Sequence, residues 1–117
     1  MIFVEYPKCS TCKKAKNWLA ASGCEFSVRH IVEEPLTSEE IKAIHLRSGF
    51  PIKKFFNTSG MKYRELGLKE KLATMSDEEC YNLLATDGML VKRPLAFDEA
   101  KVTVGFKDSD YATQWAN

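Results

Sequence analysis

Two cysteines three positions apart stand near the N-terminus, between a short apolar run and an amphipathic segment. The run Ile2–Val4 has the length and composition of a buried strand. After Cys12, apolar residues recur at helical spacing over residues 15–22, lysines fall on the other side, and Gly23 suits a helix end. The chain therefore passes from strand to helix at Cys9 and Cys12. This placement restricts the fold to one that holds both thiols at the N-terminus of a helix.

The segments that follow favour an α/β arrangement with a helical middle. Residues 26–31 are partly alternating and β-branched, which predicts a second strand, parallel to the first through a right-handed crossover. Capping boxes at residues 37–40 and 76–79 predict two helices, the second ending near Gly88. Short apolar pairs broken by glycines over residues 51–72 indicate short helical turns.

The C-terminal part predicts two more strands and a last helix. Residues 93–98 and 102–106 have strand composition around a turn at 99–100, and residues 108–115 suit a helix. A chain of 117 residues can bury enough surface for one core and not for two. We therefore expect a single domain with a small mixed sheet flanked by helices.

Charge and cysteine usage exclude several classes of protein. Lys and Arg number 17 and Asp and Glu 16, so the net charge of +1 provides no strong field toward nucleic acid or an anionic membrane. The N-terminus has no basic leader with an apolar stretch, and no apolar run approaches membrane-spanning length, which predicts a cytoplasmic protein. In that compartment the four cysteines are not expected to form a disulfide framework, so any disulfide should be transient.

The cysteine pair has the layout of a redox dithiol. With Cys9 at the N-cap and Cys12 in the first turn, the two sulfur atoms lie close enough for an S–S bond of about 2.05 Å. The helix N-terminus carries roughly half a positive charge. Lys8, Lys13 and Lys14 add to it, so a thiolate on Cys9 is favoured. Cys9, exposed before the helix, is the predicted nucleophile, and the more shielded Cys12 is the predicted resolving thiol.

The alternatives for these and the other candidate residues are structural. Two small packed cysteines are one alternative, and a zinc site is another, although zinc requires a second closely spaced pair. The remaining candidates, Cys24, Cys80, His30 and His45, are scattered singly along the chain. We expect the two cysteines to be core residues and the two histidines to be structural. We expect no metal.

Arg93-Pro94 is a second notable feature. A proline at the start of a strand commonly marks an edge strand or a turn, but in a tight functional turn its peptide bond can be cis. The residues alone leave both interpretations open.

The chain resembles the arsenate reductase-like family (ArsC, Spx and MgsR proteins, thioredoxin-like fold) essentially end to end. The resemblance is carried by the segments Tyr6–Ala15, Phe55–Leu68 and Asp87–Leu95. It implies an α/β fold with a thioredoxin/glutaredoxin-like mixed four-stranded sheet and a helical insertion, about residues 33–88, between strands 2 and 3. Residues 1–117 would form one thioredoxin-like domain. It also implies that Pro94 is cis and faces the cysteine motif, with Arg93 beside Cys9.

The resemblance and the dithiol together predict a cytoplasmic thiol–disulfide oxidoreductase or redox-responsive protein. The catalytic residues would be Cys9, Cys12 and Arg93. The substrate-binding residues would be Lys8, Ser10, Thr11, Asn57 and Pro94. The substrate would be a thiol, a disulfide or glutathione. Glutathione with glutaredoxin, or thioredoxin, would supply electrons to a monomer that holds no cofactor.

Two alternatives follow from the same resemblance. Family arsenate reductases hold the oxyanion with three arginines, whereas here only Arg93 is matched, Asn57 stands in place of the first, and Lys107 lies near the third. Loss of charge-assisted contacts worth up to ~3 kcal/mol each argues against efficient arsenate reduction. An Spx-type regulator, switched by its disulfide, would bind the C-terminal domain of the RNA polymerase α subunit. The segment 57–60 departs from the serine, threonine and arginine pattern typical of Spx proteins.

Overall fold

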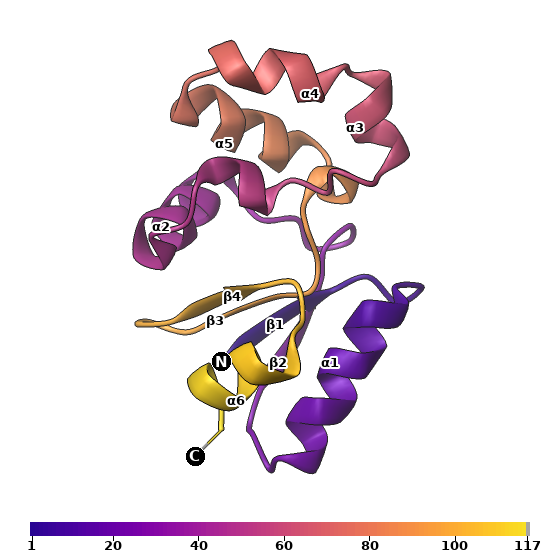
Figure 1. Ribbon diagram of the computed structural model, residues 1–117, viewed down its shortest axis with the longest axis vertical. Coiled ribbons are helices and arrows are strands. Elements are labelled where there is room, and N and C mark those ends of the chain that lie inside the picture. The colour runs from indigo at the N-terminus through magenta and orange to yellow at the C-terminus, as the bar shows by residue number, and fades with distance from the viewer. Residues whose placement is uncertain (117) are drawn as a thin grey trace.

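The computed structural model describes residues 1–116, which form a four-stranded mixed sheet with helices on both faces (Figure 1). The strands, in the spatial order β2-β1-β3-β4, are β1 (Ile2–Glu5), β2 (Ser27–His30), β3 (Leu95–Phe97) and β4 (Val102–Val104). β1 runs parallel to β2, while β3 is antiparallel to both β1 and β4. The predicted βαβ unit and the predicted mixed sheet are both confirmed.

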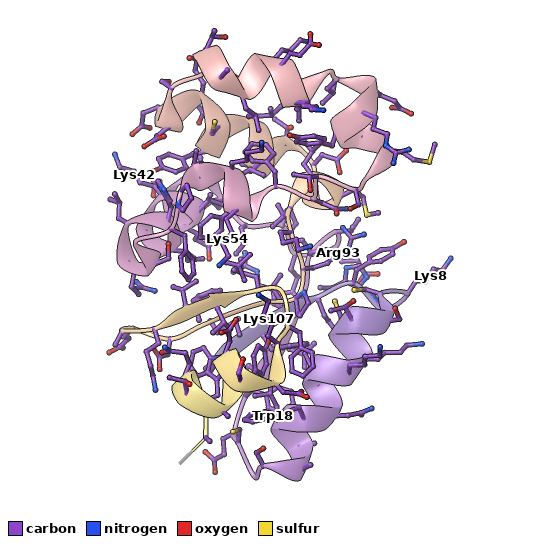
Figure 2. All side chains as sticks on the ribbon, viewed as in Figure 1. Lys8, Trp18, Lys42, Lys54, Arg93 and Lys107 are labelled. Carbon is purple, nitrogen blue, oxygen red and sulfur yellow. The ribbon has the colours of Figure 1, made fainter. Side chains whose placement is uncertain are left out.

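Alternation along the strands divides the core between the two faces of the sheet. Phe3 and Ala96 point to the face covered by α1 (Ser10–Ala21) and α6 (Asp108–Gln114), and the neighbouring Val4 and Leu95 point to the other face. Figure 2 places Trp18 of α1 between α1 and α6, where its ring meets Tyr111 edge-on at 5.6 Å between centroids. These contacts fix α1, and with it the cysteine pair, against the sheet.

Helical elements fill the chain between β2 and β3 and cover the opposite face (Figure 1). In order they are α2 (Ser38–Ser48), η1 (Ile52–Phe55), α3 (Met61–Glu65), α4 (Leu68–Lys71), η2 (Leu72–Thr74), α5 (Asp77–Thr86) and η3 (Gly88–Leu90). Both predicted capping boxes are present, Thr37 with Glu40 and Ser76 with Glu79. The middle segment consists of short turns, as its broken apolar pattern predicts.

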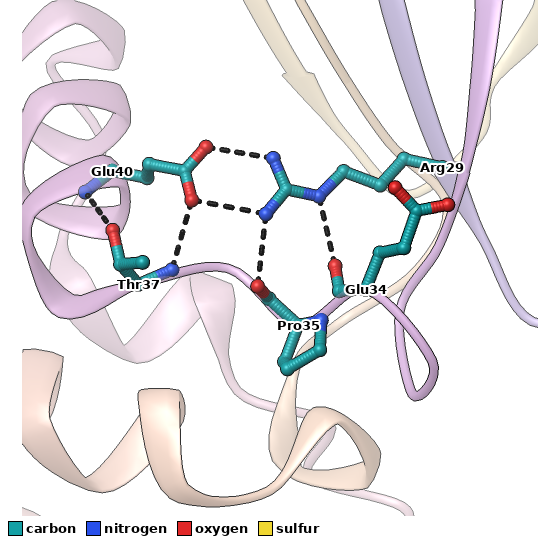
Figure 3. A network of polar contacts seen from close by, with 5 residues as sticks. All are labelled: Arg29, Glu34, Pro35, Thr37 and Glu40. Atoms are coloured by element: carbon teal, nitrogen blue, oxygen red, sulfur yellow. Dashed lines mark hydrogen bonds and ion pairs between the residues drawn. The ribbon is translucent and has the colours of Figure 1, made fainter.

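Arg29 of β2 anchors the start of this helical segment (Figure 3). Its guanidinium donates to both carboxylate oxygens of Glu40 at 2.7 and 2.9 Å, and to the backbone carbonyls of Glu34 and Pro35 at 2.8 Å each. Glu40 also accepts the backbone N–H of Thr37 as part of the capping box. One arginine therefore joins the edge strand, the connecting loop and the N-terminus of α2.

Several sequence predictions are wrong in detail. The second, third and fourth strands are shorter than predicted, since they cover residues 27–30, 95–97 and 102–104. Gly88 does not end α5, which stops at Thr86. Instead it lies so close to Ile31 that an added Cβ would be 2.2 Å from the Ile31 carbonyl oxygen. Cys24 is half-buried, while Cys80 is buried as expected.

Other predictions hold, including the structural role of His30. Its Nδ1 accepts the backbone N–H groups of Val32 and Glu33 at 3.1 Å each. Gly23 takes a φ of 72° just beyond the end of α1. Within the described residues, no helix has both the length and the apolar character needed to cross a membrane.

Candidate functional site

Cys9 occupies the N-cap of α1, as predicted. Its backbone is extended, and its Sγ accepts the backbone N–H of Cys12 at 3.2 Å. This N–H is one of the donors that a helix leaves unpaired in its first turn. A hydrogen bond from such a donor, together with the positive end of the helix dipole, stabilises negative charge on the Cys9 sulfur. The side chain is half-buried, so the sulfur is not sealed in the interior.

Cys12 lies one turn into the helix and is buried, with only 1% of its surface exposed. Burial raises the pKa of the Cys12 thiol to about 12, and the hydrogen bond and charge of Cys9 contribute to the same rise. The guanidinium of Arg93 acts on this pKa in the opposite direction. The Cys12 thiol is therefore protonated at neutral pH as long as Cys9 is not part of a disulfide.

Arg93 and Pro94 lie beside the cysteine pair. The Arg93-Pro94 peptide bond is cis, as predicted. The guanidinium carbon of Arg93 stands 5.2 Å from the ring centroid of Tyr6, a cation–π contact. The Nε and Nη1 atoms of Arg93 are buried and have no hydrogen-bond partner among residues 1–116. Buried donors without a partner are rare in folded proteins, so this side chain is suited to receive an anion.

The predicted binding residues around the pair differ in exposure. Lys8, Ser10 and Thr11 are exposed at the start of α1, and Figure 2 shows Lys8 projecting away from the molecule. Pro94 is fully buried and supports the turn at Arg93. Lys8, Ser10 and Thr11 lie where β1 leads into α1, and Pro94 lies just before β3, the strand that pairs with β1.

Asn57 is placed near the same region through its backbone. Its N–H donates to the carbonyl of Leu90 at 2.7 Å, and the neighbouring Phe56 pairs with Val91 in an isolated antiparallel bridge. This pairing brings the Asn57 segment alongside the residues that lead into Arg93. The binding role of Asn57 stays a prediction. Lys107, near the predicted third cation position, is exposed at the N-cap of α6.

Tyr6 is a site residue that sequence reasoning did not assign. It precedes the cysteine motif by three positions, its carbonyl accepts the Cys9 N–H at 2.9 Å, and its ring faces both Arg93 and His30. The available signal was the aromatic residue before Pro7, but no local pattern predicts its contact with an arginine 87 positions later.

The other two cysteines stand apart from the pair. Cys24 donates its S–H to the carbonyl of Trp115 at 3.1 Å, and Cys80 packs inside the helical insertion. Burial raises the pKa of Cys80. Among residues 1–116, no three His, Cys, Asp or Glu side chains cluster closely enough to hold a metal ion.

Comparison with known sequences identifies the family. The ArsC family model matches residues 4–114, so the chain belongs to the ArsC family. It is 58% identical over 116 residues to the uncharacterized protein YusI of Bacillus subtilis (strain 168), covering 99% of this chain and 98% of that one. It is 31% identical over 110 residues to the regulatory protein MgsR of the same organism, covering 94% and 86% of the two chains.

Comparison with solved structures supports the same family assignment. The crystal structure of an ArsC family related protein from Bacteroides fragilis superposes with a TM-score of 0.93 at 53% identity, covering 96% of this chain and 94% of that one. The predicted family and the predicted thioredoxin-like fold are therefore both confirmed.

Proposed function

We propose that this protein is a thiol–disulfide oxidoreductase or redox-responsive dithiol protein in which Cys9 attacks and Cys12 resolves. The observation that carries the proposal is the Cys9 sulfur at the N-cap of α1. It accepts a helix N–H at 3.2 Å, and the neighbouring Cys12 feels the charge of Arg93, which has two buried donors without a partner among residues 1–116. This combination favours an anionic sulfur in a place that a substrate can reach.

The first step is attack by the Cys9 thiolate on one sulfur of a substrate disulfide. A new S–S bond joins Cys9 to that sulfur, the substrate bond breaks, and the second substrate sulfur leaves as a thiolate. The half-buried position of Cys9 permits the approach, while the buried Cys12 is shielded from the same attack.

The second step is resolution by Cys12. Its thiolate attacks the Cys9 sulfur, which forms the Cys9–Cys12 disulfide and releases the substrate as a thiolate. The protein is thereby oxidised by two electrons and the substrate reduced. Burial is the largest cause of the raised pKa of Cys12, and the hydrogen bond and charge of Cys9 raise it further. A mixed disulfide at Cys9 removes this charge, so Cys12 ionises more readily after the first step than before it.

Arg93 would hold the anionic part of the substrate. An unpaired buried donor costs roughly 1–3 kcal/mol, and a carboxylate or a leaving thiolate that accepts from Nε and Nη1 removes that cost. The tripeptide glutathione, which carries two carboxylates, is a substrate of suitable chemistry. We further propose that the protein acts in the cytoplasm as a monomer. Glutathione with glutaredoxin, or thioredoxin, would then return it to the dithiol state.

The test is to trap the mixed disulfide with glutathione disulfide and identify it by mass spectrometry. Cys12→Ser should accumulate the adduct at Cys9, the wild-type protein should pass on to the internal disulfide, and Cys9→Ser should form neither. A Cys9→Ala variant that matches wild type in every redox assay would show that the dithiol is vestigial. Turnover of arsenate with glutathione and glutaredoxin would favour the arsenate reductase alternative, despite Asn57.

A second candidate is a redox-switched regulator that binds the C-terminal domain of the RNA polymerase α subunit. It is supported by the 31% identity to the regulatory protein MgsR over most of both chains and by the near-neutral net charge of +1, which suits a protein partner better than DNA. A binding measurement with the isolated α domain, on reduced and oxidised protein, tests it. Absence of binding in both states would remove this candidate.

A further inference from the structure

A cavity of about 320 Å³ lies where the helical insertion meets the segment leading into Arg93. Its lining residues are Pro51, Lys53, Lys54, Phe56, Thr58 and Lys92. Three of the six are lysines and none is acidic. The volume is at the lower end of the range for ligand pockets, roughly 300–1,000 Å³, which suits a few side chains better than a cofactor. We call this hollow the lysine cavity.

The positive charges of the lysine cavity are not neutralised by ion pairs within the described part of the chain. The ion pairs among residues 1–116 engage Lys16, Arg29 and Lys42, so the three cavity lysines have no carboxylate partner there. The segment that lines it has the same sign, because residues 51–58 contain two Lys and no Asp or Glu. Like charges gathered around one hollow repel each other, and an anion bound between them relieves that repulsion.

Two of the three lysines of the cavity, Lys54 and Lys92, lie against other parts of the chain. The Lys54 ammonium stands 3.9 Å from the centroid of the Phe50 ring, and Figure 2 shows Lys54 between the helical insertion and the sheet. The Lys92 N–H donates to the Phe55 carbonyl at 2.8 Å, and a Cβ added at Gly105 would lie 3.7 Å from Lys92 Cε. The cavity therefore lies between the insertion and the segment that enters the sheet, and the exposed Lys53 and Lys54 are accessible to a ligand.

The lysine cavity adjoins the redox site through the chain itself, because Lys92 immediately precedes Arg93. We propose that it binds carboxylate side chains of an acidic segment in the protein that exchanges disulfides with Cys9. This inference rests on the proposed function and narrows it to a class of substrate: proteins with acidic residues near the reactive disulfide. An exposed ion pair contributes roughly 1.4- to 5-fold in affinity, so two or three pairs together give a preference on the order of tenfold.

The experiment uses two matched peptides, one rich in Glu and one with Gln at the same positions. In cysteine-free form they measure non-covalent binding to the reduced full-length protein by fluorescence anisotropy. As peptide disulfides they measure the rate of exchange with Cys9. The variant Lys53→Glu/Lys54→Glu reverses charge in the cavity. Lys69→Glu/Lys71→Glu makes the same change on exposed positions of α4, outside the cavity, and is the matched control.

The wild-type protein and the control should bind the Glu peptide roughly tenfold more tightly than the Gln peptide, and this preference should weaken with salt. The cavity variant should lose the preference, bind a Lys-rich peptide instead, and exchange with the Gln disulfide at the wild-type rate. Equal binding of both peptides, or equal loss in the control variant, would overturn the proposal. The proposal would also be overturned if inorganic phosphate displaced the Glu peptide and chloride of equal ionic strength did not. The cavity would then be a site for small anions.

The same data separate the two proposals. Preferential binding of the Glu peptide without any exchange at Cys9 would contradict the proposed redox function and leave the acidic-segment site standing. Exchange at Cys9 without any preference for the Glu disulfide would contradict the acidic-segment site and leave the proposed redox function standing.

Discussion

Arg29 and Arg93 occupy opposite situations in one small protein. Arg29 donates four hydrogen bonds within its own chain, two to Glu40 and two to backbone carbonyls (Figure 3). Arg93 has two buried nitrogen atoms without a hydrogen-bond partner in the described residues, and its guanidinium lies over the ring of Tyr6. The folded chain thus pairs four of the five N–H donors of Arg29 and leaves two nitrogen atoms of Arg93 open to a ligand.

This difference indicates where stability and function are located. A guanidinium with its donors satisfied by the protein stabilises the fold and has little left to offer a ligand. A guanidinium with buried donors unsatisfied contributes little to folding and is prepared for an anion. Substitution of the two arginines should therefore produce opposite phenotypes.

The largest expected effect is on disulfide exchange in Arg93→Met. Loss of charge-assisted hydrogen bonds worth about 1.5–3 kcal/mol should slow exchange with glutathione disulfide roughly 10- to 150-fold. Exchange with the uncharged 2-hydroxyethyl disulfide should change much less. Stability should stay within about 1 kcal/mol of wild type, the value of the lost contact with Tyr6. Stopped-flow rates and urea unfolding measure the two quantities.

Arg93→Lys distinguishes charge from geometry. A lysine retains the positive charge but not the two fixed donors, so it should restore only part of the exchange rate. If Arg93→Met instead lost as much stability as the corresponding change at Arg29, Arg93 would be a structural residue and the comparison would fail.

The next effect in size is on the stability of Arg29→Met. The variant leaves the Glu40 carboxylate and two backbone carbonyls without their donor, and the partial exposure of the pair limits the cost to about 2 kcal/mol. Urea unfolding at neutral pH measures this loss, while exchange at Cys9 should be unchanged in the folded protein. Arg64→Met, at an exposed position of α3, serves as the control. An equal loss of stability in both variants would show that the hydrogen bonds of Arg29 contribute no more than an exposed arginine does.

The sequence predicted the features that depend on neighbouring residues. The strand leading to Cys9, the helix that begins at Ser10 and both capping boxes follow from local patterns of a few positions. The cysteine geometry belongs to this group, because a three-residue step at a helix start determines it. For the same reason the short turns of residues 51–72 could be predicted.

Features that depend on distant residues were not predicted. The contact of Tyr6 with Arg93, the two orphaned nitrogen atoms of that arginine and the lysine cavity arise where separate segments meet. Gly88 is an example of such a feature. Its local pattern predicts a helix end, but a glycine is required there because the Ile31 backbone approaches closely. Strand ends were misplaced because pairing partners, and not composition, determine them.

A smaller effect is expected on the pH dependence of stability. The hydrogen bond from Arg29 lowers the pKa of Glu40 from 4.5 to about 2. A lowered pKa in the folded state means that the pair stabilises the protein fully above pH 4.5, and that this stability is lost as the pH falls from 4.5 toward 2. Allowing for solvent screening, the loss is about 1 kcal/mol.

Urea unfolding of wild type and Arg29→Met between pH 6 and pH 2 measures this loss. The difference between the two proteins should narrow as the pH falls, because the other acidic groups titrate alike in both. A constant difference across this range would show that the Arg29 contacts to the carbonyls, rather than to Glu40, provide the stabilisation.

The smallest effect is expected at the ion pair between Lys42 of α2 and Glu78 of α5. Its Nζ to Oε1 distance of 2.8 Å matches the contacts of Arg29, but the side chains are 50% and 65% exposed. Water competes for both charges, so Lys42→Met should leave the melting temperature unchanged within error. A melting temperature lowered as far as in Arg29→Met would mean that short distance alone makes an ion pair stabilising. The contrast between Arg29 and Arg93 would then require an explanation other than the number of buried donors each satisfies.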